Sequence, residues 1–116
     1  MKSFRDLIVW QKSMDIVTLT YKTTKTFPVD ERFGLTLQLR RSSVSIPSNI
    51  AEGYGRFHVN DYKRFLQIAI ASLYELQTQF EIALNLEFIK KNDYDNLFEK
   101  CKEIEKMLCS LINKLK

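Results

Sequence analysis

Residues 38–56 read QLRRSSVSIPSNIAEGYGR, and this stretch decides how the rest of the chain folds around it. It places arginines, small hydroxyl residues, one proline and two closing glycines within a helical pattern. Pro47 removes a backbone donor and crowds the carbonyl four residues earlier, so we expect a kink or a local break. The closing glycines suit a helix C-terminus. A helix is therefore predicted from an N-cap at Asp30 to Gly53 or Phe57.

Three further helices are predicted on either side of this stretch, because apolar residues recur there at spacings of three and four. They cover residues 4–25, 60–91 and 93–115, and Asn60 and either Asn92 or Asp93 are the expected N-caps. Their apolar seams are Leu7, Trp10, Met14, Val17 and Tyr21; Tyr62, Leu66, Ala69, Leu73, Leu76, Phe80 and Ala83; and Tyr94, Leu97, Cys101, Ile104, Leu108, Leu111 and Leu115. We therefore expect an all-α fold, an up-down-up-down four-helix bundle with a kinked second helix and a single domain over residues 1–116.

The second helix has two apolar faces when its residues are placed at 100° intervals. The face assigned to the core contains Leu35, Leu39, Ile46, Ile50 and Phe57. A second apolar face lies almost opposite and contains Phe33, Leu37, Val44 and Ala51. Between the two faces runs a polar stripe, which includes Arg41, Ser45, Asn49, Glu52 and Arg56. Because an uncovered apolar face commonly marks an interaction site, we expect a homo-oligomer. The candidate subunit-interface residues are Phe33, Leu37, Val44, Ala51, Asn49 and Glu52.

Two alternatives accompany this interface. The second apolar face could be covered within one subunit, by wider burial in the bundle. Glu52 and Arg56 are one turn apart and could pair on a solvated surface rather than between subunits.

The basic residues are concentrated in the first half of the chain. The net charge is +4, and residues 1–64 hold 11 Lys/Arg and 6 Asp/Glu, whereas residues 65–116 hold 7 and 8. Such asymmetry favours a surface for nucleic acid, although it is also common in proteins without such a partner. The candidate residues for phosphate contact, without sequence readout, are Arg40, Arg41, Arg56, Lys63 and Arg64.

The remaining residue types argue against an enzyme, a cofactor site and a metal centre. His58 is the single histidine, and Cys101 and Cys109 have neither the spacing of paired metal ligands nor the reach for a disulfide. The serines at 42, 43, 45 and 48 have no activating base that the sequence identifies. Neither a signal peptide nor a membrane span is expected, and the predicted location is the cytoplasm.

Several of these segments resemble one known family. They are FRDLIVWQKS at 4–13, FGLTLQLRRSSVSIPSNIAEGYGR at 33–56 and FLQIAIASLYELQTQ at 65–79. Together they resemble the bacterial four-helix-bundle family named after the 23S ribosomal RNA intervening-sequence proteins. The chain is also similar to the accessory proteins of diversity-generating retroelements, whose basic ring engages nucleic acid and a reverse transcriptase.

The resemblance implies a ring-like homopentamer, in a family with no established biochemical activity. Two functions are compatible with it. One is an oligomer that binds RNA or DNA through a basic surface. The other is a structural scaffold oligomer that binds a protein partner.

Overall fold

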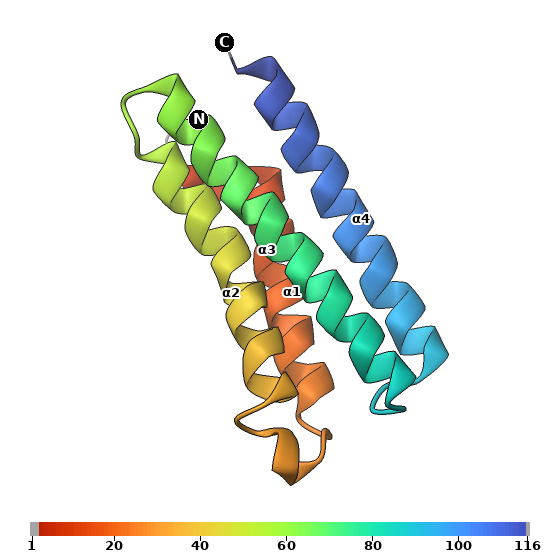
Figure 1. Cartoon of the computed structure of the whole chain (residues 1–116). Coiled ribbons are helices and arrows are strands. Elements are labelled where there is room, and N and C mark those ends of the chain that lie inside the picture. The colour runs from red at the N-terminus through yellow and green to blue at the C-terminus, as the bar shows by residue number, and fades with distance from the viewer. Residues whose placement is uncertain (1–2, 116) are drawn as a thin grey trace.

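The computed structural model describes residues 3–115, which form four α-helices and two short 3-10 helices. Consecutive helices alternate in direction, and each contacts the next, while α4 closes the bundle against α1 (Figure 1). The molecule measures 44 × 25 × 20 Å. The expected all-α four-helix bundle is confirmed. The elements are η1 (Phe4–Asp6), α1 (Ile8–Thr24), η2 (Val29–Glu31), α2 (Leu35–Tyr54), α3 (Val59–Asn85) and α4 (Lys91–Lys114).

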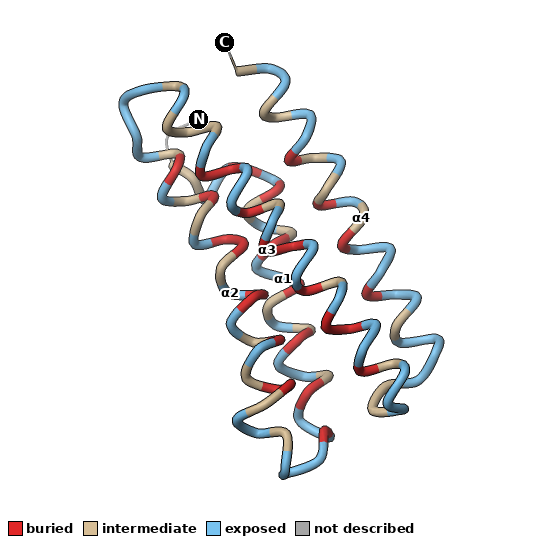
Figure 2. Tube along the Cα trace, in the orientation of Figure 1, coloured by how far each residue is buried: buried red, intermediate tan, exposed pale blue. Residues whose placement is uncertain are grey.

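The seams of α3 and α4 form the core as predicted. Leu66, Leu73 and Leu76 are fully buried in α3, and Cys101 and Leu108 are fully buried in α4. Figure 2 shows α4 with buried residues at intervals and exposed residues between them. The seam residues at the helix ends, Tyr62, Tyr94, Leu111 and Leu115, are half-buried against this core. The N-caps expected at Asn60 and at Asn92 or Asp93 are wrong by two or three positions, because the residues that precede α3 and α4 are His58 and Lys90.

The predicted seam of α1 is wrong in part: Leu7 is buried and Trp10 packs partly buried against the core, as expected, but the middle of the helix turns a different face inward. The buried face of this helix contains Val9, Ser13, Ile16, Thr20 and Thr24, whereas Met14 and Tyr21 are exposed. Burial of the hydroxyls is tolerated because each donates to a carbonyl one turn earlier: Ser13 to Val9 at 2.7 Å, Thr20 to Ile16 at 2.7 Å and Thr24 to Thr20 at 2.8 Å. Because these hydroxyls are hydrogen-bonded within their own helix, α1 can bury a face that looks polar in the sequence.

Helix α2 begins at Leu35, later than the N-cap predicted at Asp30 implies. It ends at Tyr54, one residue after the shorter predicted end at Gly53 and before the longer one at Phe57. Asp30 lies in η2, and the Glu31 carboxylate accepts instead from the Leu35 backbone N–H at 3.0 Å. The helix continues unbroken through the buried Pro47 to Tyr54, so the expected local break is wrong, whereas a kink is compatible with a continuous helix. Phe57 lies beyond the helix in the turn to α3, and its assignment to the core face is wrong.

The polar stripe of α2 lies along α3. Ser42 Oγ donates to Gln79 Oε1 at 2.7 Å, and the hydroxyls of Ser45 and Ser72 are 2.9 Å apart. Asn49 Nδ2 donates to the carbonyl of Ser45 at 2.7 Å. These contacts satisfy polar groups that are otherwise costly to bury, so the α2–α3 pair is fixed by hydrogen bonds as well as by apolar packing.

Helix α3 ends in a tight turn at Glu87. The backbone N–H of Phe88 donates to Ala83 and that of Glu87 donates to Leu84, both at 2.9 Å. This is the Schellman arrangement, in which one residue adopts left-handed geometry. Glu87 has that geometry, with a φ of 65°, although glycine is the residue that adopts it without strain.

Candidate nucleic-acid interface

The last turn of α2 and the first turns of α3 pack unusually closely at the tip of this helical hairpin. A Cβ placed on Gly53 would lie 2.7 Å from Phe65 Cβ and 3.3 Å from the Tyr62 carbonyl oxygen. Only glycine fits this approach. The rings of Tyr54 and Tyr62 meet edge to face with centroids 6.2 Å apart. The turn at residues 55–58 is therefore held on a well-packed base.

Two arginines lie over one ring at this tip. The guanidinium of Arg56 lies 4.7 Å from the centroid of the Phe65 ring, and that of Arg64 lies 5.0 Å from it. Phe65 itself is buried, so the ring is a fixed platform for both cations. Arg56 also pairs with the exposed carboxylate of Glu52 at 3.6 Å. Because this pair is exposed, it contributes little to stability.

The remaining charges near the tip leave a positive excess. Lys63 is half-buried and Arg64 is exposed, and within residues 3–115 neither forms a salt bridge. The acidic residues between positions 52 and 64 are Glu52 and Asp61. Arg56, Lys63 and Arg64 thus form one cationic group, which we call the tip cluster. These are three of the five residues predicted from the sequence.

The other two predicted cations lie away from the tip cluster. Arg40 Nε donates to Thr24 Oγ1 at 2.9 Å, and its guanidinium lies 4.6 Å from the centroid of the Tyr21 ring, so it joins α2 to α1. Arg41 is exposed and lines a polar hollow between α2 and α3. At 1.5 Å per residue, Arg41 and Arg56 are separated by roughly 20 Å along the helix. The five residues do not form one patch within a single chain.

Sequence reasoning missed Phe57, the most exposed aromatic residue in the described chain. Its relative exposure is 102%, and it lies between Arg56 and the exposed His58 in the turn that Figure 2 shows as exposed. A helix extended to Phe57 placed this side chain on the core face. The available signal is the pair Gly53 and Gly55: α2 ends between them at Tyr54, so the shorter of the two predicted extents is the better one.

The predicted subunit-interface residues fall into different environments. Val44 and Ala51 line an apolar hollow of about 390 Å³ between α1 and α2, together with Trp10, Met14 and Val17. Val44 and Met14 are 40% and 42% exposed. Leu37 and Asn49 are half-buried, and Phe33 and Glu52 are exposed. Trp10, Met14 and Val17, which were assigned to the core seam of α1, thus form one side of this hollow, and the second apolar face of α2 forms the other.

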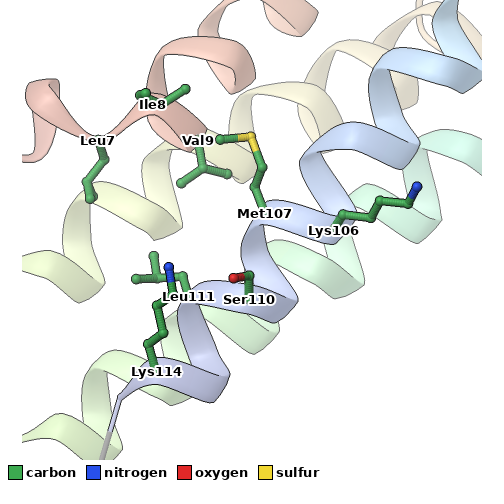
Figure 3. A pocket seen from close by; sticks show the side chains of 8 residues that line it. All are labelled: Leu7, Ile8, Val9, Lys106, Met107, Ser110, Leu111 and Lys114. Carbon is green, nitrogen blue, oxygen red and sulfur yellow. The ribbon is translucent and has the colours of Figure 1, made fainter.

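A second hollow of about 330 Å³ lies between the start of α1 and the end of α4 (Figure 3). Leu7, Val9 and Leu111 contribute its apolar lining, and Met107 extends toward Ile8 and Val9. Ile8 is 58% exposed. Lys106 and Lys114 also line the hollow, so it combines an apolar floor with cations at its border.

Outside the tip cluster, the pKa values of Cys101, Tyr74 and Glu105 are shifted by burial or by a hydrogen bond. Burial raises the pKa of the Cys101 thiol to about 12, so this thiol is neutral in the core, while Cys109 is exposed. On the α3–α4 surface, Tyr74 Oη donates to Glu105 Oε2 at 2.6 Å. This bond raises the pKa of Tyr74 and lowers that of Glu105. Over residues 3–115 we find no cluster of three metal-ligating side chains, and none of the helices is long and apolar enough to span a membrane.

Comparison with known proteins places the chain in a family. The model of the 23S rRNA-intervening sequence protein family matches residues 5–110. The chain belongs to this family. Residues 5–110 include all of α1, α2 and α3 and most of α4, so membership rests on the whole bundle and includes the tip cluster.

A solved structure supports membership of the intervening-sequence family. It is a protein of unknown function from the S23 ribosomal protein family of Bacteroides thetaiotaomicron, 27% identical, with a TM-score of 0.82. The likeness covers 90% of this chain and 98% of the other. No curated protein sequence matches the chain.

Proposed function

We propose that this member of the 23S rRNA-intervening sequence family is a non-catalytic homo-oligomer that binds RNA or DNA through phosphate contacts. The observation that carries the proposal is the tip cluster. Among the described residues, Lys63 and Arg64 have no carboxylate partner, and Arg56 and Arg64 lie over the buried ring of Phe65. Cations fixed at a protruding end can reach phosphates without rearranging the fold. A cytoplasmic location, which two free cysteines suit, is part of the proposal.

Assembly is proposed because one chain exposes two unlike apolar surfaces. The first is the hollow between α1 and α2, lined by Met14 and Val44. The second is on α3 and the residue that follows it, where Ile68, Ile82 and Leu86 are 37%, 43% and 53% exposed. Contact between unlike surfaces of successive copies closes into a ring when the rotation fits, and a pentamer is the ring that we propose. A ring repeats the tip cluster and multiplies its modest charge.

Light scattering after size exclusion tests assembly. We expect the wild-type protein at micromolar concentration to have the mass of a pentamer. Val44→Glu places a charge in the hollow and should lower the mass toward that of a monomer, with helical circular dichroism retained. Val29→Glu is the control, because Val29 is 81% exposed in the turn between α1 and α2 and lines neither surface. A monomeric wild type would contradict assembly.

Fluorescence anisotropy with labelled 20-nucleotide RNA and DNA tests binding. We expect binding at 50 mM salt that weakens steeply by 200 mM, because released counterions set the affinity. Lys63→Ala/Arg64→Ala should lower both the affinity and the salt slope. Lys22→Ala/Lys25→Ala is the matched control, since it removes two exposed lysines at the C-terminal end of α1, at the opposite end of the bundle. Absence of binding by micromolar wild-type protein at 50 mM salt would refute a nucleic-acid function.

A scaffold that binds a protein partner is the second candidate function. The hollow between α1 and α4 favours it, because an apolar floor bordered by Lys106 and Lys114 suits an amphipathic acidic helix. The test is co-purification with one partner from nuclease-treated native cells. Met107→Lys should abolish that co-purification, whereas Lys100→Ala, an exposed position on α4 outside the hollow, should not.

A further inference from the structure

We propose that Phe57 stacks on an unpaired base, and that the tip cluster therefore binds single-stranded nucleic acid in preference to duplex. This inference rests on the proposed function and names the class of nucleic acid that the interface takes. Phe57 is 102% exposed, so the fold makes no use of its apolar surface. Exposure alone would not mark a site, but here the exposed ring lies at a turn beside Arg56 and Arg64, the setting in which an aromatic side chain can receive a base.

The neighbouring cations leave the Phe57 ring free. Arg56 and Arg64 both lie over Phe65, at 4.7 and 5.0 Å from its centroid, rather than over Phe57. One phenylalanine therefore orients the cations, while the other offers an unoccupied ring beside them. Cations that follow the phosphates, together with an aromatic ring that receives a base, are the combination that proteins use to bind single strands.

The base must be unpaired for geometric reasons. In a duplex, both faces of every internal base are covered by neighbouring bases, so Phe57 could reach one only by separating two base steps. In a single strand, a base can turn onto the ring while its phosphates remain near Lys63 and Arg64. Stacking of this kind strengthens binding by roughly 5- to 150-fold per base and depends little on base identity.

Charge argues against the same turn of another copy as the occupant. Arg56, Lys63 and Arg64 surround the turn, and Lys63 and Arg64 have no carboxylate partner within residues 3–115. Two such turns brought together would repel each other. A polyanion that also presents flat apolar groups satisfies both parts of the surface.

The experiment compares Phe57→Ala with the wild type on a labelled 20-nucleotide oligothymidine and on a 20-base-pair duplex at 100 mM salt. We expect the single-strand affinity to fall at least 5-fold, the duplex affinity to change less than 2-fold, and the salt slope on the single strand to stay unchanged. Phe98→Ala is the matched control. Phe98 is 38% exposed on α4, where its ring stacks on that of Tyr94, and its loss should change neither affinity.

Phe57→Trp supplies a second readout that does not depend on affinity. It should bind the single strand as tightly as the wild type, and stacking should quench the added indole emission above the constant background of Trp10. Unchanged single-strand affinity in Phe57→Ala, equal losses on single strand and duplex, or no quenching in Phe57→Trp would each overturn the stacking role while leaving the phosphate interface intact. A wild type that binds neither nucleic acid would overturn the proposed function, and the stacking role with it. Binding to anionic phospholipid vesicles that requires Phe57, in a protein that binds neither nucleic acid, would overturn both in favour of a membrane contact.

Discussion

Gly53 on α2 and Phe65 on α3 approach so closely that a Cβ on Gly53 would lie 2.7 Å from Phe65 Cβ. Phe65 in turn carries Arg56 and Arg64 over its ring. One close approach between two helix backbones therefore sets the position of the cations at the tip. The fold and the candidate interface depend on the same contact.

Gly53→Ala should destabilise the protein by about 1–3 kcal/mol, because the new methyl group meets the root of a buried side chain that cannot move aside without shifting α3. Chemical denaturation with a fitted free energy of unfolding measures it. Gly55→Ala is the control, since its Cβ would meet only the Glu52 carbonyl at an ordinary 3.6 Å and its φ of −80° suits alanine. Equal stability of the two variants would contradict the close approach.

The buried hydrogen bond between Ser42 and Gln79 should be detectable as a coupling energy. Ser42→Ala and Gln79→Ala each leave one buried polar group without its partner and should cost about 1–3 kcal/mol. The double variant should cost less than the sum by about 0.5–1.5 kcal/mol. Thr78→Ala is the control. It removes an exposed hydroxyl on α3, next to Gln79, and should change the free energy of unfolding by less than about 0.5 kcal/mol. Additive single effects would refute the bond.

Glu87→Gly should stabilise the protein by about 0.5–1 kcal/mol and raise its melting temperature. Glycine adopts the φ of 65° at this position without the strain that a Cβ brings, and this gain exceeds the added freedom of the unfolded chain. Asn85→Gly, at the last residue of α3, should lower the melting temperature instead, because glycine weakens a helix. A lower melting temperature for Glu87→Gly would show that position 87 is not left-handed in solution.

Stability should fall in alkaline solution through Cys101. Burial raises the pKa of this thiol from 9.0 to about 12, so above pH 9 the unfolded chain loses a proton that the folded protein keeps. The neutral thiol's contribution is complete below pH 9 and is lost as pH rises toward 12. Between pH 9 and 10.5 we expect wild-type stability to fall by about 1.5 kcal/mol more than that of Cys101→Ala. Cys109→Ala, at an exposed position, should follow the wild type; parallel curves for all three proteins would exclude the effect.

The candidate site was predictable in part. The sequence indicated the cations at positions 56, 63 and 64 because charge is read directly, and their proximity followed from a turn between two helices. It missed Phe57, because a wheel that extends α2 by one turn places that ring in the core. The end of α2 depends on the close approach of its backbone to α3 at Gly53, and the sequence does not show which residues a glycine will approach.

By itself, the sequence determined the bundle and the buried faces of α3 and α4, because large apolar residues at regular spacings leave one way to bury them. It also predicted the core face of α2, where Leu35, Leu39, Ile46 and Ile50 are buried. Tertiary structure alone decided the inward face of α1, because this helix has apolar residues around much of its surface and hydroxyls such as Thr20 can be buried by bonding to their own backbone. Which face turns inward then depends on the shape of the neighbouring helix, which local periodicity does not contain.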